Sequence, residues 1–277
     1  MIEKKIGLAL GGGAARGSAH VGVLQALDEH GIHIHCLSGT SIGAFVAALY
    51  AFKVPVKEIR GLAEKLSWRD VSEFTFSKLG LFKNEEIGNI LRKYCGDVNI
   101  EDSPIPFAVV AANIRTGEKV VFKEGNLAKC VMASSAIPGI FIPVEIDGEL
   151  LVDGALVENV PIDVLKSLGS NYTVAVNLHN AATYDRPKSI VDMVGNAFFI
   201  AIDAKTNLQL EEANLRLDIN LSGCARLDNE HSLICIQKGY AAGLLAAKKL
   251  KPVQSHSLTS FARSFFPKDV DQKHISM

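Results

Sequence analysis

The chain has 277 residues, of which 48% are hydrophobic and 21% charged, and its formal net charge is −1. This composition is typical of a globular protein with a full hydrophobic core, and the near-neutral charge argues against nucleic acid or a generally anionic surface as a partner. The length suits one large α/β domain or two small ones, and no linker-like stretch favours two.

The five cysteines are widely spread and include no C-x-x-C pair, which is typical of reduced, mostly buried thiols in a cytosol. The sequence has no His and Cys cluster with metal-ligand spacing, so no metal or other cofactor is expected. The N-terminus lacks the pattern of a signal peptide, and no apolar run reaches the ~18 residues that span a bilayer. We therefore expect a cytoplasmic protein that can still visit a membrane surface as a peripheral protein.

An apolar run at residues 6–10 leads into the glycine-rich sequence GGGAARG (residues 11–17), and a helical pattern follows at residues 19–30. A glycine loop between a strand and a helix can hold a phosphate or an oxyanion, because its amides converge on one point. The spacing excludes the dinucleotide fingerprint G-x-G-x-x-G, and Gly17 lacks the following lysine of a phosphate-binding loop. Close strand–helix packing is the alternative explanation of these glycines.

A second strand is expected at residues 32–37, and a strongly apolar helix at residues 44–52. Between them the chain reads Gly-x-Ser-x-Gly, formed by Gly39, Thr40, Ser41, Ile42 and Gly43. A strand that enters this pattern and continues as a helix is the context of a nucleophile elbow. The Ser41 hydroxyl would then project at a helix N-terminus, where free amides and the helix dipole favour an anion. The alternative is a loop that only caps the helix.

Helices are expected next at residues 56–66 and 84–94, with an irregular segment at residues 67–81 between them. This segment holds the only tryptophan of the chain, Trp68. Aromatic residues near an elbow can form a lid or a wall for an acyl chain, or they can tuck into the core. The sequence favours neither interpretation over the other.

The middle of the chain contains two hairpins. The first is expected at residues 107–112 and 119–122, and a helix follows at residues 127–134. An apolar loop with two prolines at residues 135–143 leads to the second hairpin, residues 144–146 and 149–152, whose turn is Asp147-Gly148. This hairpin delivers Asp153, Gly154 and Ala155.

The last part predicts helices at residues 161–168, 189–210 and 232–250, and strands at residues 172–176 and 217–221. The apolar run at residues 197–201 is more typical of a core or a dimer face than of a membrane anchor. Strands that alternate with helices predict a mainly parallel sheet covered on both faces. We expect one domain at residues 1–250 and a tail at residues 251–277, either loosely ordered or docked on the body or on lipid.

A serine hydroxyl needs an adjacent base to become a good nucleophile. In α/β-hydrolases an acid and then a histidine follow the serine, and His179 and His231 are the candidates, but neither lies in a recognisable loop motif. Asp153 is the better candidate, because it ends a strand in an apolar stretch where partial burial would raise its pKa. A simple turn at Asp-Gly-Ala is the alternative interpretation.

Four segments in this order resemble the patatin-like phospholipases, above all their bacterial single-domain branch: residues 11–17, 39–43, 135–143 and 153–155. The similarity covers residues 5–170, and it implies a three-layer α/β/α sandwich with a mainly parallel central sheet. The resemblance further implies hydrolysis of lipid acyl esters without calcium. By position, it implies that Ser41 is the nucleophile and Asp153 the base of a dyad without histidine.

The same resemblance places the oxyanion hole at the amides of Gly12, Gly13 and Ala14, with Arg16 supporting the loop. Where the family often has a glycine in this loop, the chain has Ala14. An alanine keeps its amide, so the hole is retained if this position needs no positive φ. The Asp-Gly-Gly of the family is Asp-Gly-Ala here, with Gly154 and Ala155, a form that the family also uses.

The expected function is hydrolysis of a lipid acyl ester through an acyl-enzyme, of the phospholipase A, lysophospholipase or esterase type. The alternatives are a soluble carboxylesterase or thioesterase with the same dyad, and a regulatory or scaffold protein that binds a partner. The expected partners are a lipid or another acyl ester and, transiently, a membrane surface, with a homo-oligomer as a further option.

Overall fold

The computed structural model describes residues 4–65, 73–75, 77–178, 184, 186–224 and 230–265. In this part of the chain, an eight-stranded sheet has the order β11-β10-β1-β2-β5-β9-β8, with β6 paired to β5. Its strands are β1 (Ile6–Leu10), β2 (Cys36–Thr40), β5 (Phe107–Asn113), β6 (Lys119–Phe122), β8 (Val144–Ile146), β9 (Glu149–Asp153), β10 (Tyr172–Asn177) and β11 (Leu215–Asp218). The five strands from β11 to β5 are parallel; β6 and β9 pair antiparallel to β5, and β8 pairs antiparallel to β9.

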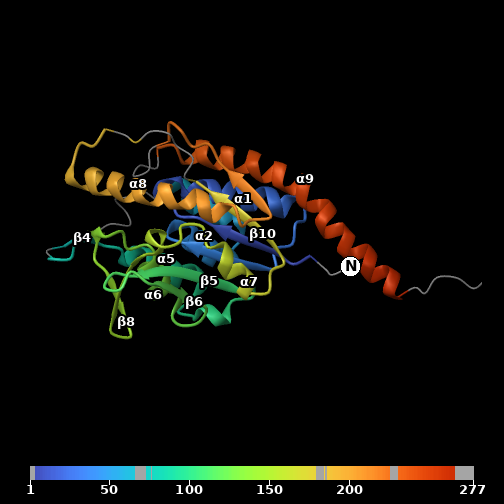
Figure 1. Ribbon diagram of the computed structural model, residues 1–277, viewed down its shortest axis with the longest axis horizontal. Coiled ribbons are helices and arrows are strands. Elements are labelled where there is room, and N and C mark those ends of the chain that lie inside the picture. Colours follow the sequence, from blue (N-terminus) through green and yellow to red (C-terminus); the bar gives the residue numbers. More distant parts are fainter. Residues whose placement is uncertain are drawn as a thin grey trace, which may run out of the picture.

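Helices cover the two faces of this sheet (Figure 1). They are α1 (Ser18–Glu29), α2 (Ile42–Ala51), α3 (Val56–Lys65), α5 (Glu85–Cys95), α6 (Leu127–Ser134), α7 (Ile162–Ser167), α8 (Ile190–Leu210) and α9 (Ser232–Phe265). Successive side chains of a strand point to opposite faces. Leu8 and Leu10 of β1 therefore join the core under α1 and α2, whereas Ala9 packs with Ile162 of α7. The predicted three-layer sandwich with a mainly parallel sheet is confirmed.

Two predicted strands are shifted along the chain. The second strand was expected at residues 32–37 and runs from Cys36 to Thr40, because it pairs with β1 from Cys36 onward. The last strand, β11, begins two residues earlier than expected, where Leu215 pairs with Val174. Ile32 and Ile34 are buried without belonging to a strand, so their apolar character alone misplaced the boundary.

A smaller sheet lies in segments that were expected to be irregular. Its strands are β3 (Glu73–Phe74), β4 (Gly80–Lys83) and β7 (Gly139–Phe141). Gly80 is needed here, since a Cβ at this position would lie 2.5 Å from the backbone of Phe141. Strands of two to four residues that pair across the chain leave little local signal. Trp68, and with it much of the expected lid or core segment, lies outside the described residues.

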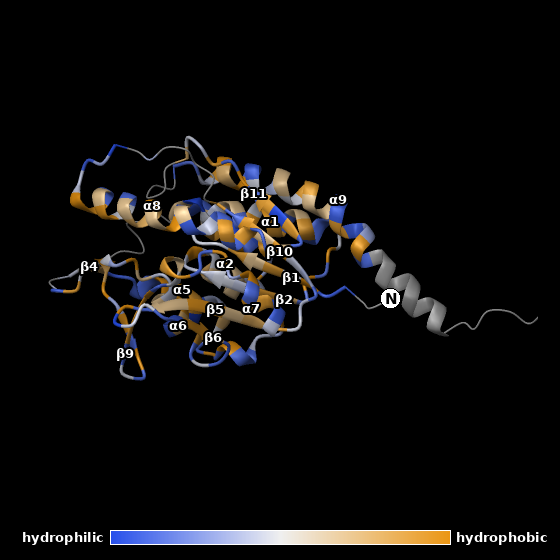
Figure 2. Ribbon diagram, in the orientation of Figure 1, coloured by the Kyte–Doolittle hydropathy of each residue, from blue (hydrophilic) through white to orange (hydrophobic). Residues whose placement is uncertain are grey.

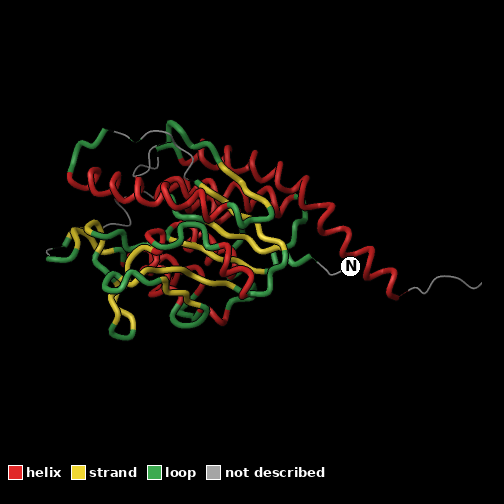
Figure 3. The backbone as a smooth tube through the Cα atoms, viewed as in Figure 1, coloured by secondary structure: helices red, strands yellow, loops and turns green. Residues whose placement is uncertain are grey.

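The last helix is longer than predicted. It was expected to end at residue 250 but runs through Pro252 to Phe265, so the expected domain boundary falls inside α9. A proline removes a single helical donor, and the helix continues on both sides of it. The far end of α9 projects from the body in Figure 3. Residues 266–277 lie outside the described part.

Helices α1 and α9 pack with their backbones in contact. A Cβ at Gly22 would lie 2.0 Å from the Ile236 carbonyl oxygen, and one at Gly239 would lie 1.9 Å from that of Ala19. Among the described residues, no helix combines the length and the apolar character needed to cross a bilayer.

Candidate active site

Ser41 forms the whole turn between β2 and α2. Its φ of 54° and ψ of −129° are rare for a residue with a side chain, and such a conformation costs about 1–3 kcal/mol. The turn is held by its amide, which donates to Ser134 Oγ at 2.8 Å, while that hydroxyl donates to the Val110 carbonyl at 2.6 Å. A Cβ at Gly43 would lie 2.1 Å from the Leu10 carbonyl oxygen. The predicted elbow is therefore a strained turn packed directly on β1.

Asp153 stands at the end of β9, where it pairs with Ala111 of β5. Its side chain is 1% exposed, and Oδ1 accepts a hydrogen bond of 2.9 Å from the Ala155 amide. The Ser41 side chain lies close enough to this carboxyl to lower its pKa. Burial has the larger effect and raises the pKa of Asp153 to about 7, against the lowering effects of Ser41 and of the Ala155 amide. The structure thus brings together the two residues that the sequence proposed as nucleophile and base.

The glycine loop differs from expectation at two positions. The Gly12 amide donates to Asn159, to Oδ1 at 3.1 Å and to the carbonyl oxygen at 3.3 Å. Among the hydrogen bonds of the described residues, none has the Gly13 or Ala14 amide as donor. Ala14 does adopt a positive φ of 50°, which costs about 1–2 kcal/mol for an L-residue but leaves its amide in place. The loop can therefore offer the amides of Gly13 and Ala14 to an anion.

Arg16 anchors the loop from the other side. It lies in a short 3-10 helix, η1 (Ala14–Gly17), and is 5% exposed. Its Nε and Nη2 donate to the Cys224 carbonyl oxygen at 2.9 and 2.7 Å. These contacts fit the expectation that Arg16 supports the loop.

The histidines occupy other positions. His20 is fully buried, and its Nε2 donates to the Gly11 carbonyl oxygen at 2.7 Å, since a carbonyl oxygen can only accept. Burial lowers the pKa of His20 to about 4, so the ring is neutral at pH 7. His33 and His35 precede β2, and His231 precedes α9. His179 lies outside the described residues. In the described part of the chain, Ser41 hydrogen-bonds to Ser134 and Phe45 and its side chain lies near Asp153, and none of its hydrogen bonds involves a histidine.

An apolar cavity of about 120 Å³ opens beside Ser41. Its walls come from α1, α2, α3 and α5, and from Phe141 of β7. The lining residues that sequence analysis missed include three of α3: Ile59, Leu62 and Ala63. Their spacing of i, i+3 and i+4 marks one face of a helix and could have identified them. A cavity with this lining suits a hydrocarbon chain better than a charged group.

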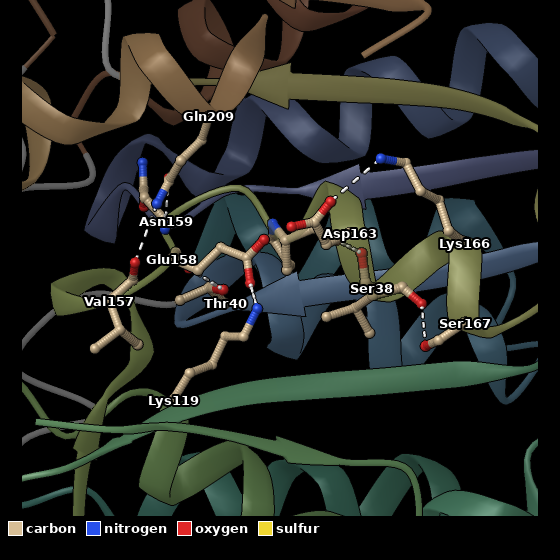
Figure 4. Close-up of polar contacts among 12 residues, drawn as sticks. Ser38, Thr40, Lys119, Val157, Glu158, Asn159, Asp163, Lys166, Ser167 and Gln209 are labelled. Atoms are coloured by element: carbon tan, nitrogen blue, oxygen red, sulfur yellow. Dashed lines mark hydrogen bonds and ion pairs between the residues drawn. The ribbon is translucent and has the colours of Figure 1, made fainter. Parts of the chain in front are cut away.

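Behind the elbow, the loop at residues 157–161 is tied to β2 and α8 (Figure 4). Thr40 Oγ1 donates to the Glu158 carbonyl oxygen at 3.0 Å, and Gln209 Nε2 donates to that of Val157 at 3.0 Å. Glu158 forms an ion pair of 2.8 Å with Lys119; burial raises its pKa more than the lysine lowers it. Sequence analysis missed Asn159 in this loop, because a single asparagine carries no signal of its own.

In the part of the chain that is described, no group of three or more His, Cys, Asp or Glu side chains is arranged to hold a metal ion. The chemistry that this arrangement can perform is that of a serine with a carboxyl base, an apolar cavity and backbone amides beside it.

Comparison with known proteins gives a consistent picture. A family model described as patatin-like phospholipase matches residues 8–166. An uncharacterized NTE family protein of Mycobacterium bovis is 37% identical over 180 residues, 64% of this chain and 50% of that protein. Lysophospholipase NTE1 of Candida glabrata is 37% identical over 179 residues, 62% of this chain and 10% of that protein. The chain thus spans half the length of the first relative and a tenth of the second.

Among solved structures, VipD from Legionella pneumophila is similar with a TM-score of 0.62 and 16% sequence identity. The similarity covers 89% of this chain and 67% of that chain, and it concerns the fold.

Proposed function

Because the chain belongs to the patatin-like phospholipase family, we propose that it is a serine-dependent lipid acyl hydrolase with Ser41 as nucleophile and Asp153 as base. The observation that carries the proposal is the contact between a serine in a strained turn and a buried carboxyl. A carboxyl with a pKa near 7 is suited to accept and return a proton at neutral pH.

The reaction proceeds through an acyl-enzyme. Asp153 accepts the Ser41 proton while Oγ attacks the ester carbonyl carbon, and the amides of Gly13 and Ala14 bind the resulting oxyanion. As the intermediate collapses, the ester C–O bond breaks and Asp153 returns the proton to the leaving alcohol. Asp153 then takes a proton from water, whose oxygen attacks the acyl carbon, and the acid leaves as Ser41 regains its proton.

The cavity is the proposed site of the acyl chain. Ser41 belongs to its lining and its walls are mainly apolar, so an acyl chain bound there can place its ester carbonyl near the hydroxyl. The name of the yeast relative supports a single-chain phospholipid as substrate. A soluble carboxylic ester or thioester is the second candidate, because the same dyad and amides serve it equally well.

The outer face of α8 is the proposed contact with lipid aggregates. Ile190, Met193, Ile200 and Leu208 are 78%, 58%, 52% and 70% exposed, while Phe198, Phe199 and Ile202 belong to a buried cluster. Figure 2 shows hydrophobic residues along α8. A helix that is apolar on both sides is normally covered on both. Arg186 and Lys188 are exposed just before this helix, which suits anionic headgroups.

Labelling with a fluorophosphonate tests the proposal. The wild-type protein should form one adduct, located at Ser41 by mass spectrometry, and Ser41→Ala should neither react nor hydrolyse lysophospholipid. Turnover of lysophospholipid well above that of short soluble esters and thioesters supports the lipid substrate, and the reverse order supports the second candidate. A folded wild-type protein without labelling or turnover would mean that the chain is a scaffold or binding protein.

A further inference from the structure

Asn159 uses every polar group it has within the protein. Its side chain is 1% exposed; Oδ1 accepts from the Gly12 amide at 3.1 Å and Nδ2 donates to Thr206 Oγ1 at 3.3 Å. Its carbonyl oxygen accepts from the same Gly12 amide at 3.3 Å, and its own amide donates to Gln209 Oε1 at 3.3 Å. Figure 4 shows Asn159, in the loop behind the elbow, beside Gln209 of α8. Asn159 therefore joins α8 to the glycine loop.

The direction of these hydrogen bonds is fixed. The Thr206 hydroxyl donates its proton to the Ile202 carbonyl oxygen at 2.9 Å, so toward Asn159 it can only accept. An asparagine side chain donates only through its nitrogen. Nδ2 must therefore face Thr206, and Oδ1 must face Gly12. The Gly12 amide therefore donates to Asn159 Oδ1, and Asn159 Nδ2 donates to Thr206 Oγ1 of α8.

Gly12 lies directly beside Ser41, the proposed nucleophile. A Cβ at this position would be 3.4 Å from the Ser41 Cβ and 2.8 Å from Asn159 Oδ1. Since two oxygens of Asn159 share the Gly12 amide, this amide is already occupied when an ester arrives. The amides that follow it, those of Gly13 and Ala14, have no recorded acceptor among the described residues.

We propose that Asn159 is a positioning residue, which holds the Gly12 amide and so fixes the glycine loop with the Gly13 and Ala14 amides facing Ser41. The inference rests on the proposed function, because an oxyanion must form at Ser41 for these amides to matter. Donors stabilise an oxyanion only if they are placed before the reaction, and a shift of about 1 Å can cost ~10²-fold in rate. Asn159 is itself held by Thr206 and Gln209 of α8, and we call this set of contacts the anchor of the glycine loop.

Two variants test the anchor. Asn159→Leu removes both side-chain hydrogen bonds. Thr206→Val removes the acceptor that orients the Asn159 amide, together with the hydroxyl's own bond to the Ile202 carbonyl oxygen. The matched control is Thr173→Val, because Thr173 is 2% exposed and its hydroxyl is also bonded to an asparagine, Asn214. Thr173 lies at the start of β10, remote from Ser41 along the parallel sheet.

With a soluble chromogenic ester, we expect Asn159→Leu to lower kcat about 10- to 100-fold and Thr206→Val about tenfold, with KM within about threefold of wild type. Thr173→Val should lose a similar amount of stability, about 1 kcal/mol for one hydrogen bond, but keep kcat within about twofold. Equal losses of kcat in the two threonine variants would overturn the proposal. Near-normal kcat in a folded Asn159→Leu protein would also overturn it. If Asn159→Leu does not fold, the comparison of kcat between Thr206→Val and Thr173→Val decides.

A second readout needs no catalysis. Hydrogen exchange of the Gly12 amide, followed by NMR, should be slow in the wild type, faster in Thr206→Val and unchanged in Thr173→Val. Unchanged Gly12 exchange in Thr206→Val means that the asparagine does not hold the amide. The two proposals can fail separately. If Gly12 exchange is faster in Thr206→Val but the wild type neither hydrolyses esters nor reacts with a fluorophosphonate, Asn159 holds the glycine loop as proposed and the proposed hydrolase function is wrong.

Discussion

Burial of Asp153 sets the pH at which the dyad can work. The carboxyl must be ionised to accept the Ser41 proton, and burial raises its pKa to about 7. We therefore expect kcat/KM for a soluble ester to rise as the pH passes through about 7 and to level off above it. A profile from pH 5 to 9 measures this, and an acid limb near pH 4 would show that the carboxyl is not desolvated in the free enzyme.

The same burial makes the ionised Asp153 a cost to stability. Its native pKa of about 7 lies above the ordinary value of 3.8, so the folded protein binds this proton more tightly than the unfolded chain. The carboxyl therefore favours folding most below about pH 4, and this advantage is lost as the pH rises to about 7. Asp153→Asn carries no charge, so its Tm relative to wild type should increase from pH 4 to pH 8.

This substitution should also reduce turnover almost to the level of Ser41→Ala, because an amide cannot accept the proton. His231→Gln is the control, and it should retain turnover within roughly tenfold, far from the ~10⁴ lost with a triad member. A Tm difference that shrinks between pH 4 and pH 8 would contradict the burial argument. Near-complete loss of turnover in folded His231→Gln would instead restore a histidine base.

At the scale of elements, the start of α2 depends on a glycine that the backbone of β1 leaves no room to replace. A Cβ at Gly43 would lie 2.1 Å from the Leu10 carbonyl oxygen and 2.6 Å from that of Gly11. We expect Gly43→Ala to destabilise the protein by at least about 1–3 kcal/mol, because backbone cannot move aside as a flexible side chain can. Urea denaturation measures the difference in unfolding free energy.

The control for this prediction is Gly61→Ala in α3, where a Cβ meets no atom within 4 Å. It should stabilise the protein by up to about 1 kcal/mol, since alanine is the better helix former. If Gly43→Ala were as stable as Gly61→Ala, α2 would have room to shift away from β1 and the elbow would be less constrained than it looks.

The elements that sequence analysis predicted well are those with long patterns or strong turn signals. The helix after Asn126 has the predicted bounds, and the Asp147-Gly148 hairpin extends one residue further than predicted. The strand before Ser41 also appears, but it is shifted along the chain by a few residues. The missed strands β4 and β7 are short, and they pair with each other across a long sequence separation, Gly80 with Gly139 and Phe82 with Phe141. Likewise Asn159 matters through partners at Gly12 and Thr206, and no local pattern reveals contacts over such separations.

At the scale of the whole molecule, the outer face of α8 can be tested as a lipid contact. In the Ser41→Ala background, which prevents hydrolysis, Ile200→Ser should weaken binding to anionic phospholipid vesicles about tenfold or more, in line with ~1.5–3 kcal/mol for a buried isoleucine. Leu245→Ser is the control, because Leu245 is 62% exposed on α9. Vesicle co-sedimentation at low and high salt provides the measurement.

Light scattering on the same variants shows whether the outer face of α8 contacts lipid or a second copy of the chain. A concentration-dependent dimer that Ile200→Ser abolishes, without a change in vesicle binding, would assign this face to a homo-oligomer. Equal weakening by Ile200→Ser and Leu245→Ser would mean that general hydrophobicity, not α8, governs adsorption.

The backbone contact between α1 and α9 has a consequence for how the protein is made. The glycine loop and α1 leave the ribosome early, but the glycines of α9 that receive α1, Gly239 and Gly243, come more than 200 residues later than Glu29. At about 5–20 residues per second, this interval lasts on the order of 10–40 s. During that time α1 can pack on β1 and its other early neighbours, but its glycine-lined contact with α9 is missing. The nascent chain therefore carries Ser41 and the glycine loop long before α9 can complete the packing of the helix that follows the loop.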